Sequence, residues 1–168
     1  MQETLIKIKG GMNFLLSRIA AALLLAMTFL VLYQVFTRYI LNDPAAFTEE
    51  LVRYLLIWTG FIGAAYAFST RQHMALVIVR DKLSPGRKKA LMAVIDAMIL
   101  LLAVFVIIIG GVKLAASASR EYSALLGIPR SLVYSMAPIS GVFIVLAQII
   151  NIYEDVTGNV IEEGGIDS

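Results

Sequence analysis

The stretch that decides the fold is residues 19–37, IAAALLLAMTFLVLYQVFT, which carries no charged side chain and lies between Arg18 and Arg38. At about 1.5 Å of helical rise per residue, it can cross most of a hydrocarbon core about 30 Å thick. Because a backbone inside a bilayer must satisfy its hydrogen bonds without water, the stretch predicts a transmembrane helix. Three further stretches of this kind follow, flanked by Arg53 and Arg71, by Lys89 and Lys113, and by Arg130 and Glu154.

These four stretches predict an all-α integral membrane protein with tilted transmembrane helices in one domain, residues 1–168. The expected helices cover about 14–40, 49–69, 86–119 and 130–153. A short apolar segment at 74–79 is expected to lie at the membrane interface, and the tail at 156–168 is expected to fray. Pro138 predicts a kink in the last helix, since proline removes a helical hydrogen-bond donor.

The composition excludes several classes of function. The chain is 60% apolar and 15% charged, against about 45–50% and 25% in soluble domains. A net charge of +2 gives no reason to expect a nucleic-acid partner, and the basic residues next to apolar stretches predict contact with lipid headgroups. With no cysteine and a single histidine, His73, the chain offers no metal-spaced cluster and no paired haem ligands. We therefore expect no bound cofactor.

The basic residues predict the orientation of the helices. Nine Lys and Arg residues belong to the first segment and the loop between the second and third helices, and five belong to the opposite side. The positive-inside rule then places both termini in the cytoplasm.

A group of charged residues surrounds the loop between the first two helices. Arg38 ends the first helix, and Glu49, Glu50 and Arg53 begin the second. Because this loop is short, we expect Arg38 to meet Glu50 or Glu49, and Glu49 to pair with Arg53 four positions later. The group could bind an anion or dock a partner loop. We favour a neutralised ion-pair network that fixes the register of the hairpin.

Asp96 is the one charged residue inside the four apolar stretches. An intramembrane carboxylate is by default a candidate for a proton or sodium relay. The alternative is a structural ion pair with Arg18, which is expected at the same level of the bundle. We favour the pair, because a lone acid makes a poor ion path.

Small residues gather on two of the predicted helices. Gly60, Gly63 and Ala64 lie on the second helix, and Gly110 and Gly111 lie on the third. Such faces let helices approach closely, either within the chain or against a partner.

An ordered set of short motifs is similar to the small, Q-type membrane subunit of tripartite ATP-independent periplasmic (TRAP) transporters. The resemblance extends from the first predicted helix to the last. Its motifs are Val35-Phe36-Thr37-Arg38-Tyr39, Asn42-Asp43-Pro44, Thr48-Glu49-Glu50-Leu51, Arg53-Tyr54-Leu55, Trp58, Gly63-Ala64, His73, Ser123-Ala124-Leu125, Ile128-Pro129 and Tyr134 to Pro138.

The resemblance implies a role in a larger assembly of the bacterial inner membrane. In such systems a periplasmic binding protein delivers an organic acid to a large membrane subunit. The large subunit carries substrate and sodium by an elevator-type movement, and the small subunit holds it. Sodium is thus expected on the large partner, and this chain is expected to be neither an enzyme nor a carrier.

Two hypotheses follow. The first is a non-catalytic scaffold for the large subunit that helps dock the binding protein. The alternative is a self-sufficient homodimeric transporter that uses Asp96 or Glu50 as its coupling acid. A haem- or quinone-anchoring subunit comes third, disfavoured by the lone histidine. On the first hypothesis the chain does not touch the transported molecule, so its sequence does not identify the substrate.

Overall fold

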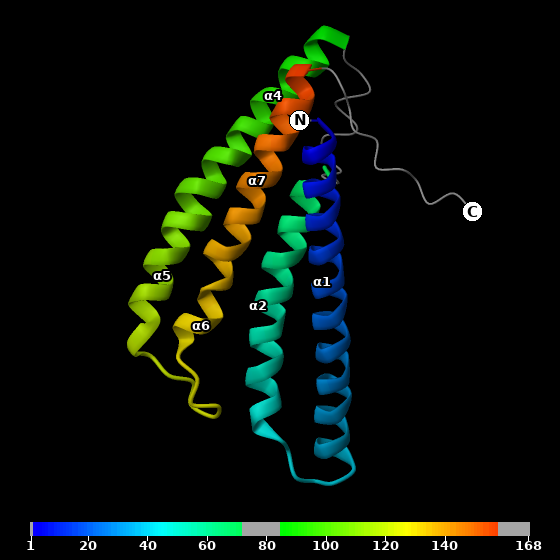
Figure 1. The fold of residues 1–168 in the computed structure, drawn as a ribbon. Helices are drawn as coiled ribbons and strands as arrows, with labels where there is room; N and C mark the ends of the chain where they lie inside the picture. The colour runs from blue at the N-terminus through cyan, green and yellow to red at the C-terminus, as the bar shows by residue number, and fades with distance from the viewer. Residues whose placement is uncertain (1, 72–84, 158–168) are drawn as a thin grey trace, which may run out of the picture.

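The structure, a computed structural model, describes residues 2–71 and 85–157 as a bundle of long helices (Figure 1). Within these described ranges, four segments are long and apolar enough to cross a membrane: Lys7–Tyr39, Ala46–Ser69, Leu91–Arg120 and Arg130–Glu154. The predicted fold class is confirmed. The helices are α1 (Gln2–Tyr39), α2 (Ala46–Ser69), α4 (Pro85–Leu102), the π-helix η1 (Ala103–Gly110), α5 (Gly111–Ser117), the 3-10 helix η2 (Ala118–Arg120), α6 (Arg130–Tyr134) and α7 (Met136–Thr157).

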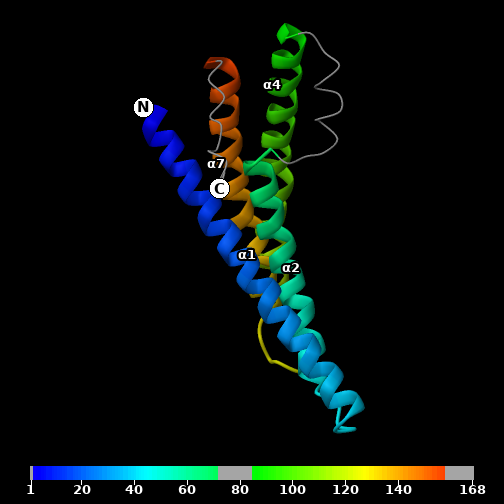
Figure 2. The ribbon, with the colours of Figure 1, turned by 90° about the vertical axis from the view of Figure 1, so that its right-hand side faces the viewer.

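The arrangement of the helices gives the bundle two distinct ends. The start of α1, the start of α4 and the end of α7 lie at one end, which we call the termini end (Figures 1 and 2). The loop between α1 and α2 lies at the other, which we call the hairpin end. Figure 2 shows α1 inclined across the other helices.

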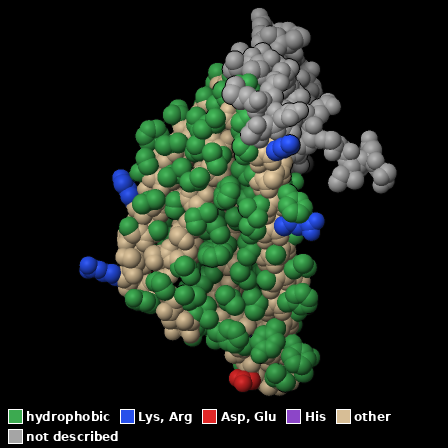
Figure 3. Space-filling view, in the orientation of Figure 1, with side chains coloured by type: hydrophobic (Ala, Val, Ile, Leu, Met, Phe, Trp, Pro, Cys, Tyr) green, Lys and Arg blue, Asp and Glu red, His purple; other side chains and the backbone are tan. Residues whose placement is uncertain are grey.

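The helix α7 lies at the centre of the bundle. Half of the most apolar part of Arg130–Glu154, the segment that contains α7, is buried, against 6% for that of Lys7–Tyr39 in α1. Apolar side chains cover most of the face seen in Figure 3, as expected for a surface in contact with lipid or with another membrane protein. The buried apolar core consists of Met12, Leu16, Ile62, Ala65, Ala103, Met136, Ile144 and Ala147.

The first helix begins earlier than predicted, at Gln2 instead of about residue 14. The predicted boundary is wrong because tertiary contacts extend the helix through Gly10 and Gly11. Lys9, Met12 and Leu16 are all buried. The second helix also begins earlier, at Ala46.

The third membrane segment is continuous from Pro85 to Arg120, but Ala103–Gly110 has π-helical hydrogen bonding that the sequence did not predict. A π-helix widens the turn locally. The widened segment packs against α7 at Gly141, where an added Cβ would lie 2.6 Å from Ile108 Cγ1.

The fourth membrane segment is divided at Ser135 into α6 and α7. The interruption lies one turn before Pro138, which has no backbone N–H to donate to the Tyr134 carbonyl. The predicted interfacial segment at 74–79, His73 and the tail from residue 158 lie outside the described residues.

Candidate functional site

Polar side chains converge at both ends of the bundle. At the hairpin end, Arg38 of α1 forms an ion pair with Glu49 of α2. The Gln34 Nε2 donates to the same carboxylate oxygen at 3.2 Å. The structure thus places Arg38 against one of the two acids predicted to meet it. Both side chains of the pair are about half exposed, so its contribution to stability is small.

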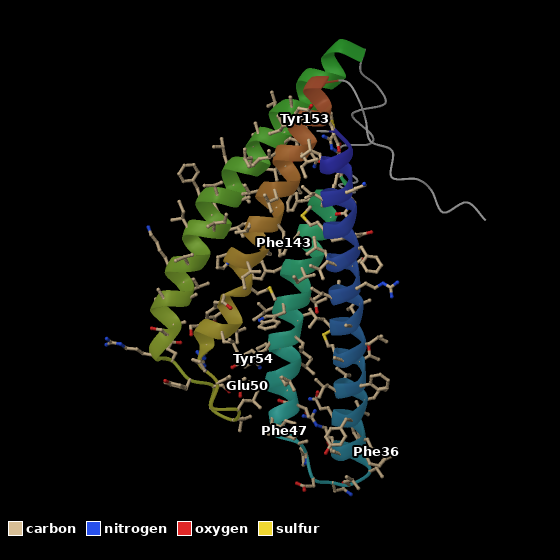
Figure 4. The ribbon with its side chains drawn as sticks, in the orientation of Figure 1. Phe36, Phe47, Glu50, Tyr54, Phe143 and Tyr153 are labelled. Carbon is tan, nitrogen blue, oxygen red and sulfur yellow. The ribbon has the colours of Figure 1, made fainter. Side chains whose placement is uncertain are left out.

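Glu50 has a different role from the one predicted. Its Oε1 accepts a hydrogen bond from the Tyr54 hydroxyl at 2.7 Å, and its Oε2 accepts one from the Leu125 backbone N–H at 3.2 Å. The Ser123 side chain also hydrogen-bonds this carboxylate. Glu50 therefore fastens the loop between η2 and α6 to the start of α2. Figure 4 shows Glu50 and Tyr54 at this end of α2.

The fastened loop has a defined backbone. The Ser123 N–H donates to the Ile128 carbonyl at 2.9 Å, and the Arg130 N–H donates to the Glu121 carbonyl at 2.8 Å. Gly127 turns the chain with a φ of 65°, a conformation that favours glycine. Because Glu50 binds a backbone N–H inside this turn, one carboxylate fixes the loop relative to α2.

Arg53 does not pair with Glu49 as predicted. Among the described residues it forms no ion pair with an acid, because Glu49 turns toward α1 to bind Arg38. Arg53 instead lines a cavity between α2 and α6. One turn further along α2, the Trp58 Nε1 donates to the Val133 carbonyl at 3.2 Å and ties α2 to α6.

At the termini end, four charged side chains form what we call the termini network: Lys9, Arg71, Asp96 and Glu154. The Lys9 Nζ lies 3.0 Å from Glu154 Oε1, and the Arg71 guanidinium lies 3.2 Å from the Asp96 carboxylate and 4.0 Å from Glu154. Lys9, Asp96 and Glu154 are buried. Among the described residues, two cations face two anions, so this part of the network is formally neutral, as buried charges require.

Further hydrogen bonds between helices lie beside the termini network. The Ser69 hydroxyl donates to Asn13 Oδ1, and the Asn151 Nδ2 donates to the Phe68 carbonyl at 3.3 Å. The Arg71 guanidinium also donates to the Asn151 carbonyl. These contacts join α1, α2, α4 and α7 at one level.

The predicted pair between Arg18 and Asp96 is wrong. Arg18 is exposed, with its guanidinium 4.8 Å from the centroid of the Phe14 ring. Arg71 takes its place because the chain turns sharply after α2, with a φ of 54° at this residue. Sequence reasoning overlooked Lys9, Arg71 and Glu154. The available signal was their position at ends of helices predicted to lie on the same side of the membrane.

Residues 27–158 match the sequence model of the DctQ component of tripartite ATP-independent periplasmic transporters. The chain belongs to this DctQ family. It is therefore a component of a transporter, and its four apolar helices make it a multi-pass membrane protein.

Two relatives agree with the family assignment of this DctQ-family chain. It is 31% identical over 132 residues to a Haemophilus influenzae protein assigned as a TRAP transporter small permease protein. The aligned residues cover 79% of the chain and 81% of that relative. It is 29% identical over 135 residues to the sialic acid TRAP transporter small permease protein SiaQ of Vibrio cholerae. The aligned residues cover 80% of the chain and 78% of SiaQ. The predicted resemblance to the small TRAP subunit is confirmed.

The small residues of this DctQ-family chain differ in their surroundings. An added Cβ at Gly111 would lie 2.9 Å from Pro138 Cδ, so Gly111 allows α5 to pack closely on α7. Gly110 has a looser environment, where an added Cβ would lie 3.8 Å from the Phe105 carbonyl oxygen.

At Gly60 and Gly63 an added Cβ would meet nothing within 4 Å. These two glycines and the partly exposed Ala64 therefore do not mark a close helix crossing among the described residues. Sequence reasoning missed Gly141, which does mark one.

Proposed function

We propose that this chain is the non-catalytic small membrane subunit of a sodium-coupled secondary transporter for organic acids. In this proposal it lies in the bacterial inner membrane with both termini in the cytoplasm. It holds a large elevator-type membrane subunit that carries sodium and substrate, and it helps dock a periplasmic substrate-binding protein. The family supports the transporter component, and the name of the SiaQ relative associates that relative with sialic acid.

The observation that supports the scaffold role is that Asp96 and Glu50 are both held in structural contacts. A coupling acid must take up and release an ion during transport. Asp96 instead lies against Arg71, and Glu50 holds the Leu125 backbone. The two acids that the alternative homodimeric carrier would use are thus engaged in contacts between helices and loops. This favours a support over a carrier.

The open surface of α2 also supports the proposal. An added Cβ at Gly60 or Gly63 would meet no atom within 4 Å, and only 11% of the most apolar part of α2 is buried. Small residues on an open face permit close contact with another membrane helix. We propose that the large subunit packs here.

The proposal can be tested by separating assembly from transport. The large subunit is purified and reconstituted in liposomes with and without this chain, and sodium-driven uptake is measured with the binding protein present. A scaffold predicts that uptake falls strongly without the chain. Full uptake by the large subunit alone would contradict the proposal.

A matched pair of variants separates a scaffold from a carrier. Asp96→Asn removes one charge of the Arg71 pair, and the double variant Asp96→Asn with Arg71→Gln restores neutrality. A scaffold predicts that uptake falls in proportion to the amount of complex that co-purifies, and that the double variant recovers part of both. Loss of sodium coupling in a normally assembled complex would favour the carrier.

Arg38→Ala tests the hairpin end. If the Arg38–Glu49 pair supports assembly, the variant lowers the yield of complex and leaves the apparent substrate affinity of the remaining complex unchanged. A large rise in the substrate constant with normal assembly would contradict the expectation.

A further inference from the structure

A cavity of about 170 Å³ lies between α2 and α6 at the hairpin end. It is distinct from the Arg38–Glu49 pair, which lies between α1 and α2. Figure 4 shows two of its residues, Glu50 and Tyr54, on the same part of α2. The lining residues are Glu50, Arg53, Tyr54, Ile57, Arg130, Val133 and Tyr134.

Two arginines make this cavity attractive to an anion. Arg53 is exposed and forms no ion pair within the described part of the chain. Arg130 lies 3.2 Å from Glu121, but both side chains are about half exposed, so water weakens this pair. Two arginines from different helices thus line one cavity, and within the described residues neither is held in a buried ion pair.

The carboxylate of Glu50 does not neutralise these arginines by direct contact. Its two oxygens accept hydrogen bonds from the Tyr54 hydroxyl and the Leu125 backbone N–H, both of which are neutral donors. Among the lining residues, Arg53 and Arg130 against Glu50 leave an excess of one positive charge, which Glu121 beside Arg130 offsets only through a half-exposed, water-weakened pair. Tyr134 adds a hydroxyl that can donate to an oxygen atom.

We propose that this cavity is an oxyanion site in which Arg53 and Arg130 bind a phosphate group. The planar guanidinium offers paired N–H donors that match phosphate oxygens, which lysine cannot do. The cavity volume of about 170 Å³ is several times the roughly 30 Å³ that one water molecule occupies in the liquid, so the cavity has room for a phosphate group.

The position of the cavity suits the phosphate of a lipid headgroup. Tyr54 and Tyr134 both line the cavity, and tyrosine is enriched at the membrane interface. Leu56 and Leu132, on the same two helices, are exposed apolar residues that can contact acyl chains. Free inorganic phosphate has the same chemistry, so the experiment has one arm for each source.

The lipid arm uses the purified full chain in mixed micelles that contain either phosphatidylglycerol or diacylglycerol, which lacks the phosphate. Bound lipid is counted by native mass spectrometry. We expect retention of phosphatidylglycerol over diacylglycerol, and a loss of about tenfold in affinity in Arg53→Gln, as for one hydrogen-bonded charge. Arg53→Lys is expected to lie between the two. Arg18→Gln is the matched control, because it removes the same charge from an exposed position on α1.

The second arm measures the melting temperature of the chain in detergent with inorganic phosphate or with chloride at equal ionic strength. A stabilisation specific to phosphate that Arg53→Gln abolishes, without selective retention of phosphatidylglycerol, would identify a free anion as the source and still support the site. Glu50→Gln keeps an acceptor for Leu125 and removes the negative charge, so it should strengthen binding severalfold in whichever arm is positive. The proposal is overturned if Arg53→Gln and Arg18→Gln match the unmodified chain in both arms.

Discussion

The Lys9 ammonium and the Glu154 carboxylate, 145 positions apart in the chain, form a buried ion pair with Nζ–Oε distances of 3.0 and 3.1 Å. This pair joins the first turns of α1 to the last turns of α7. It also explains why α1 extends as an ordered helix well beyond its most apolar part. A lysine at the membrane surface would normally extend to water, but here it is 6% exposed.

Breaking this pair should destabilise the bundle. Lys9→Met removes the nearer of the two cations that the described residues place beside the buried Glu154, and removing one partner of a buried ion pair costs about 3–5 kcal/mol. The double variant Lys9→Met with Glu154→Gln should recover much of this loss. The measurement is the free energy of unfolding in mixed micelles. Lys7→Met is the control because Lys7 is exposed. Equal stability of Lys7→Met and Lys9→Met would show that the pair has no structural role.

Removing the Glu50 carboxylate should release the loop at Leu125. In Glu50→Ala the Leu125 N–H loses its acceptor, so its hydrogen exchange should become faster by at least tenfold, the equivalent of about 1.4 kcal/mol. Glu50→Gln keeps an oxygen acceptor and should show a smaller change. Exchange is followed by mass spectrometry of the peptide over 121–130, with Glu49→Gln as the control. Unchanged protection in Glu50→Ala would mean that the loop is held by its own hydrogen bonds.

Two glycine substitutions should have opposite effects on the isolated chain. Gly141→Ala places a Cβ against Ile108 and should destabilise the fold by about 1–3 kcal/mol. Gly60→Ala adds a Cβ in open space and should be neutral or stabilise by up to about 1 kcal/mol through helix propensity. Melting temperatures in detergent distinguish the two. If Gly60→Ala destabilises the isolated chain as much as Gly141→Ala, the packing of α2 described above is incorrect.

The orientation predicted from the basic residues can be tested because the chain contains no cysteine. A cysteine introduced by Asn42→Cys should react with a membrane-impermeant maleimide on intact cells, and one introduced by Gln2→Cys should react only after the cells are opened. The physical reason is the excess of Lys and Arg in the first segment and in the loop between the second and third predicted helices. The reverse pattern of labelling would place the termini outside.

The sequence was most informative where the determining interaction is local. Each apolar stretch must form a helix in a bilayer, so four spans follow without knowledge of their neighbours. The contact between Arg38 and Glu49 was also within reach, because a short loop leaves few alternatives for residues on either side of it. The effect of Pro138 on the preceding turn was also predictable, since it follows from the missing N–H of the proline backbone.

The partners of Asp96, Glu50 and Gly141 were decided only by the tertiary structure. Hydropathy gives the depth of a residue in the membrane but not the direction of its side chain, so Arg18 and Arg71 were equally eligible for Asp96. The turn at Arg71 settled this choice. Likewise, the position of the loop at Leu125 assigned Glu50 to a backbone N–H. The crossing of η1 and α7 required glycine at 141.

The sequence by itself determined which segments lie in the membrane, because burial in lipid is a property of each segment. The pairing of their charges depends on relative rotation and tilt, which only the packed bundle fixes.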